Sequence, residues 1–184
     1  MRIVAGEFRG RAIAAPATNA IRPTTDRTRE TLFNILAHAG GVTLDGARVL
    51  DLFSGTGALG LEALSRGGRF CLFVEEGVEA RGLLRTNIES FGLQGRTKIF
   101  RRDATSLGAV GTMEPFDLLF ADPPYGKGLG EAALTSAAAG GWLVPGAVCI
   151  VEEAASAAFP HPDGFTLSDE RSIGETVLRF LRFG

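Results

Sequence analysis

The chain has 184 residues, of which 45% are apolar and 22% charged, and its formal net charge is −2. This length and composition are typical of one globular domain with a sizeable core. No apolar run approaches the ~20 residues of a membrane span, and the first residues lack the pattern of a signal peptide. We therefore expect a cytoplasmic protein, and a monomer, with no membrane partner. Cys71 and Cys149 lie in apolar runs and the histidines are scattered, so no cluster of metal ligands is expected.

Charge is divided unevenly along the chain. Residues 1–36 carry six arginines against three acids, a net +3, which leaves residues 37–184 with −5. The six are Arg2, Arg9, Arg11, Arg22, Arg27 and Arg29. A basic N-terminal segment before an acidic remainder suggests that this segment meets an anionic partner. A solvent-exposed segment without a partner would have the same composition.

Residues 1–41 predict a hairpin followed by a helix, an N-terminal extension to the rest of the chain. Two short apolar runs, 2–5 and 11–14, flank a turn that contains two glycines. After a loop, Thr25 or Asp26 caps a helix that runs to about His38 and is stopped by glycines. The apolar stripe of this helix leaves Arg27 on its outer side.

Residues 42–184 alternate strand and helix patterns, which indicates one compact α/β unit with a parallel sheet. The expected strands are 47–53, 70–74, 97–100, 116–121 and 148–151, the helices are 59–66, 79–91 and about 130–139, and a closing antiparallel hairpin covers 165–172 and 175–183.

A glycine loop follows the first of these strands. Gly55, Gly57 and Gly60 follow an apolar strand and lead into a helix, where backbone N–H groups and the positive end of the helix dipole meet a ligand. The same spacing fits a dinucleotide site, so two ligand classes compete. Asp51, at the end of the strand, would repel a pyrophosphate. It favours a cofactor with an ammonium and a sulfonium, S-adenosylmethionine.

Five apolar strands end in an acidic residue, namely Asp51, Glu75, Asp103, Asp122 and Glu152. Ligands of open α/β sheets bind outside the carboxyl ends of the strands, so these acids are expected along one edge. Glu75 is placed to accept both hydroxyls of a ribose. Asp103 is placed to accept from an adenine amine, although a loop cap explains it nearly as well. Glu152 could support the site or be a solvated strand end.

The motif Asp122-Pro123-Pro124-Tyr125 indicates chemistry on an amino group. Two prolines remove two N–H donors, so the loop presents the Asp122 carboxylate and the Pro123 carbonyl as acceptors. Two acceptors suit an NH2 group and favour a pyramidal nitrogen whose lone pair points at a methyl group. Tyr125 would stack on a base taken out of its helix.

These motifs resemble the RsmD family of bacterial 16S ribosomal RNA guanine-N2 methyltransferases. The resemblance rests on the Asp-Pro-Pro-Tyr motif, residues 6–11, the Arg-Pro-Thr segment of residues 22–33, and the glycine loop of residues 51–68. It implies a class I S-adenosylmethionine-dependent methyltransferase fold with a Rossmann-like seven-stranded sheet, its last strand antiparallel, in residues 42–184. It also implies methylation of guanine 966 of 16S ribosomal RNA, in the usual numbering, within an assembling small ribosomal subunit.

The resemblance implies a role for each site residue. Asp51, Gly55 and Gly57 contact the methionine part of the cofactor, Glu75 its ribose and Asp103 its adenine. Asp122, Pro123 and Tyr125 hold the target guanine as catalytic residues, with Pro124 beside them. Arg22 and Thr24 lie near the cofactor or the RNA. An acidic sheet edge would repel the phosphates of RNA. Contacts that attract these phosphates are therefore expected from five arginines, Arg9, Arg11, Arg22, Arg27 and Arg29.

Other targets remain open at this stage. The same chemistry serves adenine-N6 methylation of DNA and glutamine methylation of protein. A non-catalytic ribosome assembly factor and an NAD-dependent oxidoreductase are weaker alternatives, because the first need not keep Asp-Pro-Pro-Tyr and the second would not place Asp51 at a pyrophosphate.

Overall fold

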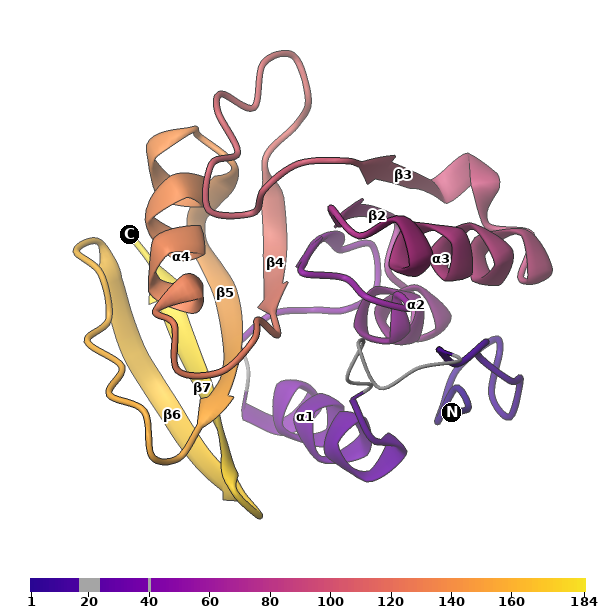
Figure 1. Cartoon of the computed structure of the whole chain (residues 1–184), viewed down its shortest axis with the longest axis horizontal. Coiled ribbons are helices and arrows are strands. Elements are labelled where there is room, and N and C mark those ends of the chain that lie inside the picture. The colour runs from indigo at the N-terminus through magenta and orange to yellow at the C-terminus, as the bar shows by residue number, and fades with distance from the viewer. Residues whose placement is uncertain (17–23, 40) are drawn as a thin grey trace.

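The computed structural model describes residues 1–16, 24–39 and 41–184. Its seven strands are β1 Arg48–Leu52, β2 Phe70–Val74, β3 Thr97–Phe100, β4 Phe116–Ala121, β5 Leu143–Ala154, β6 Phe165–Ile173 and β7 Thr176–Phe183. They form one sheet in the order β3-β2-β1-β4-β5-β7-β6. Figure 1 shows β3 toward one end of this sheet and β6 toward the other. The strands from β1 to β5 are parallel, whereas β7 is antiparallel to β5 and β6. The order reverses between β1 and β4, which is where ligands of such sheets bind.

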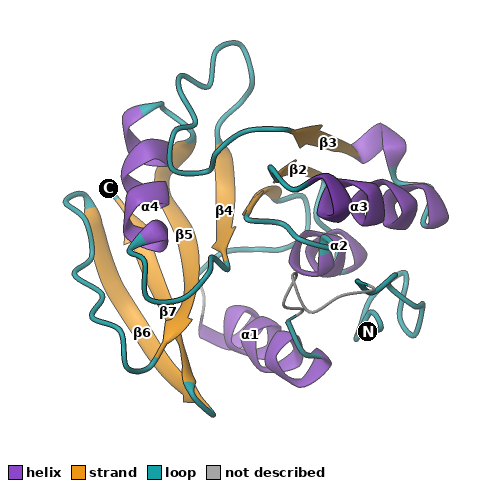
Figure 2. Cartoon of the chain, viewed as in Figure 1, coloured by secondary structure: helices purple, strands orange, loops and turns teal. Residues whose placement is uncertain are grey.

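Helices cover both faces of this sheet (Figure 2). They are α1 Asp26–Ala39, α2 Ala58–Ser65, α3 Val78–Ser90 and α4 Leu129–Ala139. Successive strand residues point to opposite faces. Val49 accordingly belongs to the core cluster with α1, α2 and α3, while Leu50 belongs to the cluster with α4. Because both faces are buried, the central strands are continuous apolar runs, as parallel sheets require.

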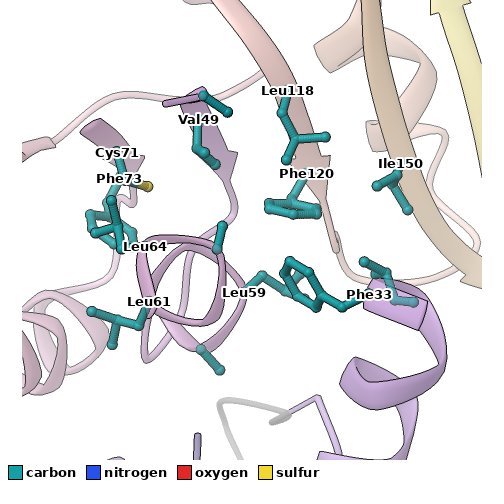
Figure 3. Packing of buried hydrophobic residues seen from close by; sticks show 14 of the residues in the cluster. Phe33, Val49, Leu59, Leu61, Leu64, Cys71, Phe73, Leu118, Phe120 and Ile150 are labelled. Atoms are coloured by element: carbon teal, nitrogen blue, oxygen red, sulfur yellow. The ribbon is translucent and has the colours of Figure 1, made fainter. Parts of the chain in front are cut away.

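Figure 3 shows how the first face is packed. Leu59, Leu61 and Leu64 of α2 belong to the core cluster on this face. Leu59 extends toward Phe33 of α1, and Phe33 approaches Phe120 of β4. The two rings are 5.6 Å apart between centroids and tilted by 58°. Helix α1 therefore belongs to the same core as the sheet.

The N-terminal extension packs on α2 and α3. The predicted hairpin is present as a chain reversal with one antiparallel bridge, between Arg2 and Ala12. A longer ladder does not form because the N–H groups of Val4 and Ala5 donate to the carboxylate of Glu62 in α2, at 2.9 and 3.1 Å. The reversal is thus held both by backbone hydrogen bonds between its own two arms and by α2.

The predicted elements are confirmed with small shifts at their ends. Helix α1 begins at Asp26, and the Thr25 hydroxyl caps it by accepting from the Thr28 N–H at 3.1 Å. Strand β5 begins at Leu143, five residues before the predicted start, because Leu143 pairs with Phe116 ahead of an irregularity in the register. Within the described ranges, no helix combines the length and the apolar character that crossing a bilayer requires.

Candidate active site

Two glycines around the start of α2 have no room for a side chain unless their neighbours shift: Gly57 in the loop between β1 and α2, and Gly60 in the first turn of α2. A Cβ on Gly57, whose φ is +84°, would lie 2.4 Å from Leu84 Cδ1, and one on Gly60 would lie 2.5 Å from Phe73 Cε1. Phe53 has a φ of +54°, which non-glycine residues rarely adopt. Such strain concentrates at functional sites, where the surrounding structure holds it in place.

Asp51 is buried at the end of β1, with 1% of its surface exposed. Its Oδ2 accepts from the Gly60 N–H at 3.0 Å, so it fixes the first turn of α2. Burial raises the pKa of Asp51 well above its ordinary value, the charges of Asp122 and Glu75 raise it further, and the Gly60 hydrogen bond opposes them. A buried carboxylate among like charges is a suitable partner for a cationic ligand group.

Glu75 and Asp103 follow the two neighbouring strands. Glu75 joins two loops, because its Oε1 accepts from the Gly55 N–H and its Oε2 from the Gly77 N–H, both at 2.8 Å. Asp103 caps its own loop by accepting from the Thr105 N–H at 2.8 Å and the Thr105 hydroxyl at 2.7 Å. These bonds lower the pKa of Asp103. Both alternatives for Asp103 therefore have support, since it caps a loop and also faces the cavity.

The strand ends enclose a cavity of about 760 Å³. Six acidic residues line it: Asp51, Glu75, Glu76, Glu79, Asp103 and Asp122. No lysine, arginine or histidine among the described residues lines it. Thr24, Gly55, Pro123 and Pro124 also reach the cavity, whereas Gly57, Tyr125 and Glu152 are not part of its wall. The prediction of an acidic edge is confirmed for four of the five strand-end acids.

The Asp-Pro-Pro-Tyr loop is held from both of its ends. The Thr24 hydroxyl donates to Asp122 Oδ2 at 2.9 Å. Four residues after Asp122, the Gly126 N–H donates to Oε1 of buried Glu153 at 3.0 Å. Pro123 between them is buried. The orientation of the Asp122 carboxylate thus depends on residue 24, and the exit of the loop depends on β5.

Thr24 is itself fixed by Arg29, which has none of its surface exposed. Arg29 Nη1 donates to the Thr24 carbonyl at 3.2 Å, and Nη2 donates to Asp26 Oδ1 at 2.6 Å and to the Arg2 carbonyl at 2.5 Å. Its Nε lies 3.7 Å from Glu62 Oε1 in α2. Burial lowers the pKa of Arg29, while the charges of Asp26 and Glu62 raise it. Arg29 therefore joins the extension, α1 and α2 beneath the site.

The expectation that Arg29 contacts RNA is wrong, because a fully buried guanidinium cannot reach a phosphate. Four functional residues escaped the sequence analysis: Arg29 as an anchor, Glu62, Glu153 and the strained Phe53. The spacing of Asp26 and Arg29 on one helix face is the one signal that could have indicated a local ion pair. Nothing in the sequence distinguishes Glu153 from Glu152.

The other N-terminal arginines differ in their surroundings. Arg9 and Arg27 are exposed. Arg11 is also exposed, but its guanidinium lies 4.8 Å from the Phe91 ring centroid and donates to the Ser90 carbonyl at 2.5 Å, so it ties the extension to the end of α3. The prediction for Arg22 lies outside the described residues.

Comparison with known proteins places the chain in a family. Residues 1–182 match the family described as "Conserved hypothetical protein 95". The chain belongs to this family. It is 37% identical over 181 residues to the ribosomal RNA small subunit methyltransferase D of Escherichia coli, an alignment that covers 97% of this chain and 88% of the relative. It is 39% identical over 137 residues to the putative rRNA methyltransferase YlbH of Bacillus subtilis, covering 73% and 72% of the two chains.

A solved structure agrees with these relatives. The putative methyltransferase yhhF of Escherichia coli superposes with a TM-score of 0.84 at 32% identity, covering 100% of this chain and 97% of that one. The RsmD resemblance and the class I methyltransferase fold are confirmed, and the chain is a methyltransferase. An NAD-dependent oxidoreductase is thereby set aside.

Proposed function

We propose that the chain transfers a methyl group from S-adenosylmethionine to the exocyclic N2 amine of a guanine in 16S ribosomal RNA, guanine 966 in the usual numbering. One observation carries this proposal: the acidic cavity contains the Asp122 carboxylate and Pro123 beside a glycine loop. The relatives named as small-subunit ribosomal RNA methyltransferases support the choice of target. The RNA would be met within the small ribosomal subunit or an assembly intermediate, which would place the reaction in the cytoplasm.

The charge of the cavity fits this cofactor. A ligand with an ammonium and a sulfonium would be stabilised by the carboxylates, whereas a pyrophosphate would be repelled. Asp51, with Gly55 and Gly57, would hold the methionine part, Glu75 the ribose hydroxyls and Asp103 the adenine amine. When bound, S-adenosylmethionine supplies an electrophilic methyl group, and the residues of the chain supply position and charge.

The acceptor loop would bind the guanine amine through two acceptors. The Asp122 carboxylate and the Pro123 carbonyl would each accept one N–H, which directs the nitrogen lone pair toward the methyl group. Asp122 would also stabilise the positive charge that develops on nitrogen until its proton leaves. Tyr125, partly buried just after the two prolines, would stack on the base, with Pro124 at the mouth of the site.

The substrate would approach along the N-terminal extension. Arg9 and Arg27 are exposed there, and Arg11 and Arg22 are included with them as proposed contacts to the RNA, with Thr24 supporting the acceptor loop. Adenine in DNA and glutamine in protein are the alternative amino groups. We expect the enzyme to act as a monomer without a metal.

Methyl transfer from labelled cofactor into small subunits that lack the modification tests the proposal. Label is expected on the N2 amine of one guanine. Asp122→Asn should lower kcat about 10³-fold, because one electrostatic contact to the reacting group typically contributes 10²–10³, while the variant still binds S-adenosylmethionine. Label found on DNA adenine or on protein glutamine, or no transfer into subunits and naked RNA, would contradict the assigned substrate.

A further inference from the structure

A second groove lies between α3 and β3, the strand at one end of the sheet. Figure 1 shows this pair of elements at the opposite end of the sheet from β6. The groove has a volume of about 400 Å³. Its lining residues are Arg81, Arg85, Ile88, Glu89, Gln94, Thr97, Lys98, Ile99 and Arg101. Its wall thus holds four cations and one carboxylate in a chain whose net charge is negative.

Most of these cations have no internal role. Arg85, Lys98 and Arg101 are exposed, and they form no hydrogen bond or ion pair with any described residue. Arg81 differs, because its Nη1 donates to the Glu76 carbonyl. By contrast, Arg11 and Arg29 of the N-terminal extension are used in internal contacts. Uncommitted positive charge therefore gathers at α3 and β3 as much as in the extension.

The groove adjoins the active-site cavity on both of its walls. On α3, residues 78–80 line the cavity and Arg81 begins the groove. On the other wall, Arg101 lies two residues before Asp103, which lines the cavity. A polyanion in the groove would thus run up to the acidic site without crossing it.

Protection of an edge strand is a second explanation for a surface lysine. Among the described strands β3 pairs only with β2, and a lysine on such a strand discourages pairing with another chain. This explains Lys98. It does not explain Arg85, which stands on a helix, or Arg101, which follows the strand.

We infer that this α3–β3 groove binds the phosphodiester backbone of the substrate RNA. The inference rests on the proposed function, because the acidic cavity repels phosphates and requires a neighbouring positive surface to retain RNA. Ile88, which is buried, and Ile99, which is partly buried, give the groove an apolar floor on which sugars can lie. The contacts would fix the position of the RNA and would read no sequence.

The test compares two double variants of the full chain with equal charge change. Arg85→Ala with Lys98→Ala removes two of the four groove cations and leaves Arg81 and Arg101 in place, because Arg81 binds the Glu76 carbonyl and Arg101 is close to Asp103. Arg69→Ala with Arg171→Ala is the control, because both are exposed arginines outside the groove, paired only with Glu114 and Asp169. A third variant, Arg85→Lys with Lys98→Arg, keeps the charges.

Binding to naked 16S ribosomal RNA and to small subunits is measured over a range of salt. The groove variant should bind both the naked RNA and the subunits about tenfold more weakly at physiological salt. The slope of log K against log salt should become shallower by about 1.5, because two phosphate contacts are lost and each contributes about 0.7–0.9 to the slope. The control and the charge-keeping variant should match the unsubstituted chain. Affinity for S-adenosylmethionine and kcat at saturating RNA should not change.

Three results would overturn the inference. A groove variant that binds RNA like the control would show that the groove does not hold the backbone. Weaker binding to subunits with unchanged binding to naked RNA would assign the groove to an acidic protein partner. If the unsubstituted chain methylates no RNA, the proposed function fails and the inference fails with it. In the first two cases the unsubstituted chain still methylates RNA, so only the inference about the groove fails.

Discussion

We propose that one half of the cavity binds the cofactor (the cofactor half) and the other binds the acceptor amine (the acceptor half), and the two halves are built in different ways. In the cofactor half, at the ends of β1, β2 and β3, the carboxylates bind nearby backbone: Asp51 accepts from an N–H nine residues away and Glu75 from one 20 residues away. In the acceptor half, at the end of β4, Asp122 is held by Thr24, 98 residues away. The cofactor half is therefore largely a product of one strand–loop–helix–strand segment, and the acceptor half depends on the N-terminal extension.

This difference suggests that the two halves can be damaged separately. Changes beneath Thr24 should weaken the acceptor loop or the fold and leave cofactor affinity intact. Changes at Asp51 should affect the cofactor first. One contact crosses the division, because the charge of Asp122 contributes to the raised pKa of Asp51.

The largest effect is expected from Arg29→Met, which removes the anchor of the acceptor half. The substitution removes a buried cation beside the Glu62 carboxylate. Because breaking a buried ion pair destabilises the fold, the free energy of unfolding should fall by about 3 kcal/mol. Arg27→Met on the same helix is the control, since exposed positions change stability by about 0.5 kcal/mol or less. Urea unfolding measures both. Equal losses in the two variants would show that Arg29 does not anchor the extension.

Asp51→Asn tests the cofactor half. A charge-assisted contact contributes about 1.5–3 kcal/mol, so affinity for S-adenosylmethionine should fall about 30-fold. Calorimetry over a pH range should show the affinity of the unsubstituted chain rising with pH as the Asp51 proton is lost, with a flat profile for Asp51→Asn. Asp122→Asn should shift that rise to lower pH, because it removes one of the charges that raise the pKa of Asp51. A pH profile identical in all three proteins would contradict the role of Asp51.

The same substitution should stabilise the chain without cofactor. Since the folded-state pKa of Asp51 is above its ordinary value of 3.8, the folded chain binds more protons than the unfolded chain between the two values, and stability falls as pH rises through this window. Asn has no such loss. Asp51→Asn should therefore have a higher Tm at neutral pH, and the difference should shrink as the pH approaches 4.

Sequence reasoning correctly placed residues of the cofactor half at one cavity, for a physical reason, while their roles toward the cofactor stay predictions. Asp51, Gly55 and Glu75 are positioned by strand ends and by a glycine loop, and both leave local patterns of apolar runs and spacing. The Asp-Pro-Pro-Tyr motif was equally visible. The contacts that hold this loop cannot be seen in the sequence, because Thr24, Arg29 and Glu153 come close to it only when distant segments pack. A buried arginine also resembles an exposed one in sequence, and for that reason the sequence predicts an RNA contact for Arg29, which is buried.

Thr24→Val sharpens the comparison between the halves. Valine has a similar shape but cannot donate to Asp122 Oδ2, so the carboxylate loses a fixed orientation and kcat should fall about tenfold, the value of one hydrogen bond of about 1.4 kcal/mol. Thr24→Ser keeps the hydroxyl and should restore most of the rate. Affinity for S-adenosylmethionine should be equal in all three proteins. If valine lowers cofactor affinity and leaves kcat unchanged, Thr24 belongs to the cofactor half instead.

The smallest effect is expected at the far end of the acceptor loop, where Glu153 accepts from the Gly126 N–H. Glu153→Ala leaves this N–H without its acceptor and frees the loop after Tyr125, so kcat should fall about threefold, at the lower limit of a net hydrogen-bond contribution. Glu153→Gln keeps an oxygen at the same place and should stay close to the unsubstituted rate. Such a pattern would show that the backbone contact matters and the charge does not. Equal rates for Ala and Gln, both near the unsubstituted value, would mean that the two prolines alone hold the loop, and the dependence of the acceptor half on distant segments would then reduce to Thr24 and its anchor.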